Sequence, residues 1–388
     1  MIPLAIPNIS GNEAAYLMEC VRTNFVSSVG PFVARMEEMT AQATGAAACA
    51  ATSSGTTGLH AALMAVGVGS GDLVLLPSFT FIASANAVAH CHAEPWFVDI
   101  SPDSWCMNPA QLADLLFKET RREGGRLVHA ASGRRVAAIM PVYTLGTPAD
   151  MDPILELARE YGLLVVADAA ASLGARYKRR NLAGLADLSV VSLNGNKTVT
   201  AGGGGAVVGN DESLVGLVRH LTTTARVGDD YDHDRIGYNY RMTNLQAAVG
   251  CAQLERLDEF VAAKRRIRAR YDQALVSIPG IGPFPQPAWA ESGCWFSGVV
   301  LEDPALPTVT EVCVELRLRG VGARAFWKPV HLQPPFRAAP RAALPVTEST
   351  WDKVVTLPCS TQLGDVEQAQ VIAAVRDVLL VPAKHAHP

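Results

Sequence analysis

The stretch "LSVVSLNGNKTVTAGGGGAVVG", residues 188–209, decides the fold class because it joins a short apolar run to a lysine and four glycines. Its first six residues are uncharged and of strand length, which predicts a buried strand. Similar apolar runs precede it at 73–77, 95–99, 136–142 and 163–168, with helical stretches between them. This alternation predicts an α/β fold with a mainly parallel sheet covered by helices on both faces. Because open sheets of this kind bind ligands beyond the carboxyl ends of their strands, we expect the site there.

The pattern changes after Gly209. Apolar positions at helical spacing predict one long helix over about 243–277, which begins with a capping box of Thr243 and Gln246. The stretch "SIPGIGPFPQPAW" then marks a boundary. Beyond it we expect a strand in "CWFSGVVLE" and helices in "TEVCVELRLRG" and "DVEQAQVIAAVRDVLL". We therefore predict a large domain over 1–250 and a smaller α+β domain over 251–388 that includes the linking helix.

Composition limits the classes of function. The formal net charge of -4 and the pI near 6.1 lack the basic footprint of a nucleic-acid-binding protein. The sequence has no basic leader and no apolar run long enough to span a membrane, so we expect no membrane partner and a cytoplasmic location. None of the eight cysteines forms a C-x-x-C pair, and adjacent side chains in "HCH" (90–92) point apart, so we expect no metal site.

A lysine and an aspartate follow two of the predicted strands. Lys197 is either a solvated strand-end residue or, near a low-dielectric site, a nucleophilic amine. Asp168 ends the strand at 163–168, where a carboxylate needs a helix to cap or a positive partner. Gly202 to Gly205 allow the backbone to approach a ligand or a neighbouring strand closely. The segment "GNKT" lacks the glycine spacing of a P-loop, which excludes that class of phosphate site.

A third feature is the segment "ATSSGTTGLHAAL". Small hydroxyl residues and Gly55 stand where an amphipathic helix begins, so they either cap that helix or present free N–H groups to a phosphate. A phosphate cradle, a strand-end acid and a strand-end lysine are together what a pyridoxal phosphate (PLP) enzyme of the aspartate aminotransferase fold needs. The lysine bonds to the cofactor, and the acid keeps the ring nitrogen protonated.

These motifs resemble those of the DegT/DnrJ/StrS sugar aminotransferases. The resemblance runs in order through "NFVSSVGPFV", "ATSSGTTGLHAAL", "LPSFTFIASANAV", "DAAASLGARYK", "SLNGNK", "HLTTTARV", "IGYNYRMTNLQAAVGCAQLERLDEF" and "WKPVHLQPPF". It covers nearly the whole chain. It implies a homodimeric PLP-dependent enzyme of fold type I, with active sites shared between subunits.

The resemblance also implies roles for single residues. Lys197 would bond to the cofactor and carry the proton. The other cofactor-binding positions would be Gly55, Thr56, Thr57, Phe81, Asp168, Ala171 and Ser192, together with Asn239 supplied by the partner subunit. Asn244 is the alternative to Asn239 as phosphate ligand. Asn24 and His331 would face the substrate.

The implied substrates are an amino acid donor, with L-glutamate expected, and a nucleotide-linked keto sugar. "NFVSSVGPFV", "NGNK" and "LTTTA" most resemble enzymes that aminate UDP-2-acetamido-4-keto-2,6-dideoxyhexoses of the bacillosamine and legionaminic acid type. "WKPVHLQP" also resembles the perosamine enzymes, so a GDP- or dTDP-linked keto sugar is the alternative.

Two other functions are possible on the same fold. A sugar dehydratase would carry histidine in place of Lys197, which argues against that class. A non-catalytic sensor is favoured slightly by Ala171, where many relatives carry glutamine or glutamate. Ala167 is a second departure, since many relatives carry glutamate there. A neutral hydrogen bond lost at position 171 is worth about 1 kcal/mol and affects donor handling or substrate range.

Overall fold

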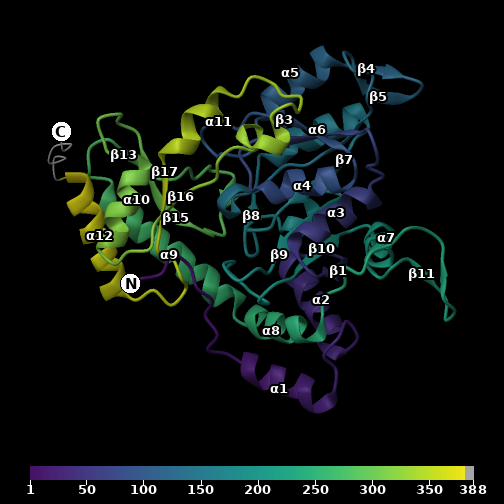
Figure 1. Ribbon diagram of the computed structural model, residues 1–388, viewed down its shortest axis with the longest axis horizontal. Helices are drawn as coiled ribbons and strands as arrows, with labels where there is room; N and C mark the ends of the chain where they lie inside the picture. The colour runs from purple at the N-terminus through teal and green to yellow at the C-terminus, as the bar shows by residue number, and fades with distance from the viewer. Residues whose placement is uncertain (381–388) are drawn as a thin grey trace.

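The computed structural model describes residues 1–380, and its largest element is a seven-stranded sheet (Figure 1). The spatial order of its strands is β1 (Ala48–Thr52), β10 (Gly205–Gly209), β9 (Leu188–Ser192), β7 (Leu164–Asp168), β6 (Val136–Ile139), β2 (Leu73–Pro77) and β3 (Glu94–Val98). Strand β10 runs opposite to the other six strands, which are parallel to one another. The five predicted strands are all present, within three residues of their expected ends, and the predicted fold class is confirmed.

Helices cover both faces of this sheet because alternate strand residues point to opposite sides. On β9, for example, Val190 belongs to the apolar cluster beneath one set of helices, and Val191 belongs to the cluster beneath the other. The first set comprises α3 (Gly55–Ala65), α4 (Ile82–His90) and α7 (Glu212–Thr222). The second set comprises α2 (Pro31–Thr44), α5 (Pro109–Glu119), α6 (Met151–Tyr161) and α8 (Asn244–Leu254). Helix α1 (Glu13–Thr23) packs on α8.

The predicted single helix over 243–277 is wrong, because the structure has two helices there. The first, α8, begins with the predicted capping box of Thr243 and Gln246. The second, α9 (Leu257–Leu275), follows a break at Glu255 and Arg256. Glu255 accepts hydrogen bonds from Tyr16 and Asn12 near α1, which holds the break in place. Apolar spacing continues across the break, so it could not reveal the change of direction.

The C-terminal part forms a second, antiparallel sheet in the order β13 (Ile281–Gly282), β15 (Ser297–Leu301), β17 (Val354–Leu357) and β16 (Arg324–Ala325). It packs with α10 (Val309–Leu318), α12 (Asp365–Leu380) and the second half of α9. The strand and the two helices predicted here are confirmed. Ile2 and Leu4 also pack on this apolar cluster, although the predicted division assigns them to the first domain. The division at 250 and 251 stays a prediction, and residues 381–388 lie outside the described part.

Short elements complete the chain. They are α11 (Pro345–Thr350) and the two-stranded pairs β4 (Thr120–Glu123) with β5 (Arg126–His129), β8 (Arg176–Tyr177) with β14 (Ala290–Glu291), and β11 (Arg226–Val227) with β12 (Asp232–His233). The β11–β12 pair protrudes from one side of the molecule beyond α7 (Figure 1). No helix within residues 1–380 combines the length and the apolar character needed to cross a membrane. The cytoplasmic location stays a prediction.

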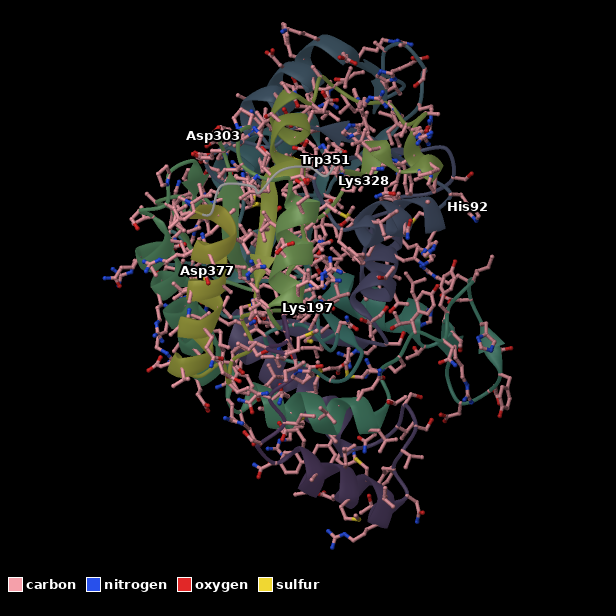
Figure 2. All side chains as sticks on the ribbon, turned by 60° about the vertical axis from the view of Figure 1, so that its left-hand side comes forward. His92, Lys197, Asp303, Lys328, Trp351 and Asp377 are labelled. Carbon is pink, nitrogen blue, oxygen red and sulfur yellow. The ribbon has the colours of Figure 1, made fainter. Side chains whose placement is uncertain are left out.

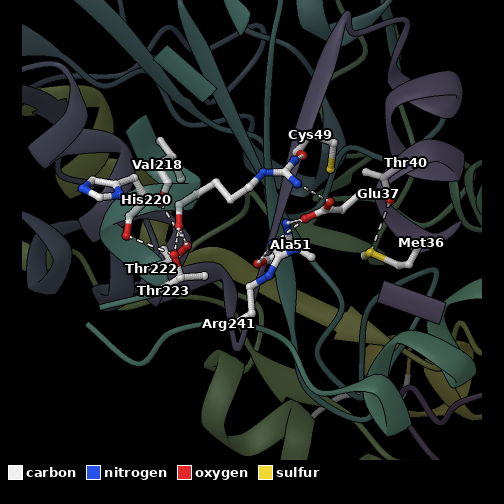
Figure 3. Close-up of polar contacts among 11 residues, drawn as sticks. Met36, Glu37, Thr40, Cys49, Ala51, Val218, His220, Thr222, Thr223 and Arg241 are labelled. Carbon is white, nitrogen blue, oxygen red and sulfur yellow. Dashed lines mark hydrogen bonds and ion pairs between the residues drawn. The ribbon is translucent and has the colours of Figure 1, made fainter. Parts of the chain in front are cut away.

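A buried carboxylate ties the protruding segment to the sheet. Glu37 on α2 accepts hydrogen bonds from the backbone N–H of Ala51 and from the guanidinium groups of Arg219 and Arg241 (Figure 3). Glu37 is 7% exposed, so it needs these partners to offset the loss of hydration. Arg241 lies in "GYNYR", directly after the segment that contains β11 and β12. The cluster therefore fixes the place where this segment rejoins the fold.

Candidate active site

A cavity of about 690 Å³ lies where the carboxyl ends of the large sheet meet the C-terminal sheet. Residues at or after the ends of β1, β2, β6, β7 and β9 line one side of it, and residues near β15 and β16 line the other. Seven of the predicted site residues line this cavity: Gly55, Thr56, Phe81, Asp168, Ala171, Ser192 and Lys197. The topology of the sheet explains why residues so far apart in the chain meet here.

Lys197 lies toward the middle of the molecule (Figure 2). It ends the turn after β9, where its backbone N–H donates to the carbonyl of Asn194 at 2.9 Å. Burial lowers the pKa of Lys197 from 10.5 to about 8, and the negative charge of Asp168 opposes that shift. A lysine in these surroundings loses its proton more easily than an exposed lysine, which makes its amine nucleophilic near neutral pH.

Asp168 is buried at the end of β7, with 6% of its surface exposed. Its Oδ2 accepts from the hydroxyl of Ser84 at 2.6 Å, and its Oδ1 accepts from the backbone N–H of Ala170 at 3.1 Å. Burial raises the pKa of Asp168, while these two hydrogen bonds and Lys197 lower it. These hydrogen bonds hold the carboxylate in place, and no cationic side chain of the described residues forms an ion pair with it. The site therefore suits a cationic partner in the cavity.

Helix α3 begins at the cavity, so its first N–H groups and the positive end of its dipole lie there. Ser54 and Thr57 form a reciprocal capping box: the hydroxyl of Ser54 accepts from the N–H of Thr57, and the hydroxyl of Thr57 accepts from the N–H of Ser54. The capping interpretation thus holds for these two side chains. Thr57 turns back to its own helix and does not line the cavity, whereas Gly55 and Thr56 do.

Glycines bring the backbones around α3 close together. A Cβ atom on Gly205 would lie 2.7 Å from the backbone nitrogen of Gly55, and one on Gly55 would lie 3.0 Å from Cβ of Ser192. The fourth glycine of the run therefore lets β10 pass directly behind the start of α3. This close approach is the packing role expected for the glycine run.

Aromatic and cationic side chains line the outer part of the cavity. Phe81 is 56% exposed, and its ring centroid lies 6.2 Å from that of Trp327. Arg324 and Lys328 are exposed, line the cavity and form no ion pair with any residue of the described part. An aromatic wall beside two free cations suits a substrate that carries both a planar base and phosphate or carboxylate groups.

The sequence of residues 7–376 matches the model of the DegT/DnrJ/EryC1/StrS aminotransferase family. The chain belongs to this family. A GDP-perosamine synthase of Caulobacter vibrioides is 37% identical, over 98% of each chain. EpsN of Bacillus subtilis, named as a candidate pyridoxal phosphate-dependent aminotransferase, is also 37% identical, over 96% of this chain and 94% of its own. The crystal structure of a family member from Brucella abortus superposes with a TM-score of 0.85 at 29% identity, over 94% of this chain and 95% of its own.

The predicted enzyme class and cofactor are thereby confirmed, and this family member is a PLP-dependent sugar aminotransferase. The cavity of this aminotransferase fits the cofactor. The start of α3 suits the phosphate, and Asp168 suits a protonated ring nitrogen. Lys197 offers an amine for the aldehyde, and Phe81 offers a ring face. The volume also leaves room for part of a second, larger substrate.

Besides Thr57, four predicted residues of the aminotransferase lie outside this cavity. Asn24 is exposed at the C-terminus of α1, and Asn239 is exposed beside Thr223. Asn244 is buried, where its side chain accepts from the N–H of Phe32 and donates to the carbonyl of Phe25. These bonds occupy Asn244 within the same chain, so nothing in the fold favours it as a phosphate ligand.

His331 is the fourth of these residues. It is 3% exposed, and its Nδ1 lies 2.7 Å from the hydroxyl of Ser78. Burial lowers the pKa of His331. The neighbouring Gln333 lines the cavity instead. A direct contact between His331 and the substrate stays a prediction that this position does not favour.

Sequence reasoning missed Ser84 and Trp295, which contact the two central groups. Ser84 donates to Asp168, and the ring centroid of Trp295 lies 3.6 Å from Nζ of Lys197. Ser84 lies one turn after Phe81 on α4, in the quoted segment "LPSFTFIASANAV", but no spacing rule connects it to Asp168. Trp295 stands in "CWFSGVVLE", which reads only as the start of a strand.

Proposed function

We propose that this aminotransferase transfers the amino group of an amino acid, L-glutamate in our expectation, to the 4-keto group of a GDP-linked deoxysugar of the perosamine type. The observation that carries the proposal is the 37% identity, over 98% of both chains, to a GDP-perosamine synthase. A GDP-perosamine synthase of Vibrio cholerae supports it at 30% identity, over 97% of this chain. The proposal takes up the alternative drawn from "WKPVHLQP" in place of the first choice, a UDP-linked acetamido sugar.

The proposed chemistry assigns a task to each central residue. When bound, PLP supplies an aldehyde that exchanges amino groups and a ring that withdraws electrons from the reacting carbon. Lys197 Nζ would take the proton from the α-carbon of the donor, which requires its neutral form, and would deliver a proton to the sugar carbon that receives the amino group. The lowered pKa of Lys197 supports this task near neutral pH. Asp168 holds a proton on the ring nitrogen, and the start of α3 holds the phosphate.

The outer cavity supports a nucleotide sugar as the acceptor. Arg324 and Lys328 place two positive charges at the cavity, where a diphosphate would be neutralised. Phe81 and Trp327 offer ring surfaces to the sugar or the base. None of these residues distinguishes guanine from uracil, so the choice of GDP depends on the relatives.

We propose further that the enzyme acts as a homodimer with shared sites. Exposed apolar side chains gather on two segments, at Met18, Val21, Phe25 and Val29 and again at Val227, Tyr231 and Ile236. Surfaces of this kind are typical of subunit contacts. Asn239 lies just beyond the second segment and outside its own cavity, which is consistent with delivery to the partner's cofactor phosphate.

The decisive experiment presents the purified enzyme with L-glutamate and a panel of GDP-, UDP- and dTDP-linked 4-keto-6-deoxysugars. Mass spectrometry should detect replacement of the keto oxygen by an amino group with the GDP compound. Conversion of only the UDP or dTDP compounds would overturn the choice of nucleotide. A protein that forms the PLP complex and does not react with any amino acid would support the sensor alternative.

A further inference from the structure

The side chain of Trp295 lies against the amine of Lys197. Lys197 Nζ is 3.6 Å from the centroid of the Trp295 ring, well within the range of a cation–π contact. The two residues come from different sheets, since Lys197 follows β9 and Trp295 precedes β15. The contact therefore depends on how the C-terminal sheet packs over the cavity.

Hydrogen bonds hold Trp295 through both its ring and its backbone. The Nε1–H of Trp295 donates to the carbonyl of Asn196 at 2.8 Å, and its backbone N–H donates to the carbonyl of Leu145 at 3.0 Å. The carbonyl of Trp295 accepts from Nζ of Lys264 at 3.0 Å. Lys264 is 2% exposed and also donates to the carbonyl of Cys359 at 2.6 Å. Burying a lysine costs free energy, and its hydrogen bonds to these two carbonyls offset part of that cost. The same bonds fix the backbone of Trp295.

The backbone beside the ring is also unusual. Leu145 has φ 59° and Cys294 has φ 50°, so both adopt the left-handed conformation that non-glycine residues rarely take. The carbonyl of Leu145 accepts from the backbone N–H of Trp295, and Cys294 directly precedes Trp295. Conformations of this kind persist where surrounding contacts enforce them, and they concentrate at functional sites.

We propose that Trp295 is the positioning residue for Lys197: its ring face receives the free side-chain nitrogen, and its Nε1–H fixes the turn that carries the lysine. The inference rests on the proposed role of Lys197 as the residue that bonds to the cofactor. The ring attracts the amine of Lys197 whenever the amine is protonated, and the ring also covers one side of the amine. The bond to Asn196 acts on the residue directly before Lys197. Both contacts keep Nζ at the cavity when it is not bonded to the cofactor.

The test compares Trp295→Leu and Trp295→Phe in the full-length enzyme after removal of its cofactor. Added PLP produces a visible absorbance band as it bonds to Lys197, and the rate of this change is measured. Trp295→Leu loses the ring and the N–H, so we expect the rate to fall by about thirtyfold. Trp295→Phe keeps a ring face and loses only the N–H, so we expect about a fivefold decrease.

Two controls separate positioning from general damage. Trp289→Leu makes the same substitution outside the cavity, where the indole N–H donates to the carbonyl of Pro148 at 3.4 Å, and should stay within about twofold of the native rate. Affinity for pyridoxamine phosphate, which forms no bond to lysine, is then measured calorimetrically with Trp295→Leu and Trp295→Phe in a Lys197→Ala background. Neither substitution should change that affinity by more than about twofold if Trp295 acts through Lys197.

Several results would overturn the proposal. One is a native rate in both Trp295 variants, and another is an equal loss of pyridoxamine phosphate affinity when Lys197 is absent, since Trp295 would then act on the cofactor directly. If Trp295→Leu does not fold, Trp295→Phe alone tests the proposal. Its rate of bonding to PLP is then compared with its affinity for pyridoxamine phosphate in the Lys197→Ala background. A visible band that forms equally well in Lys197→Ala would instead refute the role of Lys197 and leave the proposed function without its central residue.

Discussion

The hydroxyl of Ser84 donates to Oδ2 of Asp168 at 2.6 Å, although the two residues lie 84 positions apart in the chain. Ser84 is on the first turn of α4, and Asp168 ends β7. The bond favours the charged carboxylate and so opposes the rise in the pKa of Asp168 that burial causes. It therefore helps to keep the charge that a protonated ring nitrogen needs.

Ser84→Ala should weaken the enzyme most at low pH. Without the hydroxyl, the pKa of Asp168 rises further, and the charged form is lost at a higher pH than in the native enzyme. A hydrogen bond to a charged group is worth about 1.5–3 kcal/mol, which predicts a loss of about tenfold or more in kcat/KM on the acidic side. The pH profile of the donor half-reaction checks the shift. Ser189→Ala removes a buried hydroxyl that has no hydrogen-bond partner in the described part, and should leave the profile unchanged.

Lys197 should react as a free amine well below the pH at which lysine ordinarily does. Its pKa is lowered from 10.5 to about 8, so half of it is neutral near pH 8 in the folded, cofactor-free enzyme. Labelling with an amine-reactive ester at a series of pH values, quantified by mass spectrometry at this one lysine, gives the midpoint. The same lysine in urea-unfolded protein should show the ordinary value.

Asp168→Asn tests the sign of the coupling between the two residues. The charge of Asp168 raises the pKa of Lys197, so removing that charge should lower the labelling midpoint further. A midpoint that rises, or that stays at the native value, would contradict the coupling.

Gly205→Ala should destabilise the protein and weaken cofactor binding. The added Cβ would lie 2.7 Å from two backbone atoms, the nitrogen of Gly55 and the oxygen of Val191, and neither can move without shifting α3 or β9. Overpacking of this kind costs about 1–3 kcal/mol, which urea unfolding measures. Gly216→Ala is the matched control, because its Cβ meets no atom within 4 Å on α7, and alanine should stabilise that helix by up to about 1 kcal/mol. Equal stability of the two variants would show that the fold does not require the close approach of β10 to the start of α3.

Arg324→Gln and Lys328→Gln should each raise the KM for the nucleotide sugar by about tenfold, because each removes a charged partner of the diphosphate. The donor half-reaction, followed from the cofactor spectrum with L-glutamate alone, should change little. Arg337→Gln alters an exposed arginine that does not line the cavity and serves as the control. If the donor half-reaction slows as much as the overall reaction, these cations bind the carboxylates of the donor instead.

The central part of the site could be predicted because it follows from sheet topology. Lys197, Asp168 and Ser192 each end or follow an apolar strand, and parallel strands present their carboxyl ends at one edge. Of the two meanings weighed for residues 53–57, capping is confirmed for Ser54 and Thr57, and phosphate binding stays a prediction that the position of Ser54, Gly55 and Thr56 at the cavity favours. The local sequence pattern was sufficient to place these residues, because each lies at the end of a strand or the start of a helix that the pattern predicts.

Contacts between distant elements could not be read in the same way. The break at Glu255 depends on partners near α1, and the contact of Trp295 with Lys197 depends on the packing of the second sheet. His331 has the residue type of a substrate ligand, yet its backbone places it beneath Ser78. Residue order alone thus determined the strands, the helix starts and the chemical groups at the strand ends, because these depend on neighbours in the chain. Only the tertiary structure decided which side chains touch Lys197 and Asp168, because those contacts depend on how separate layers pack.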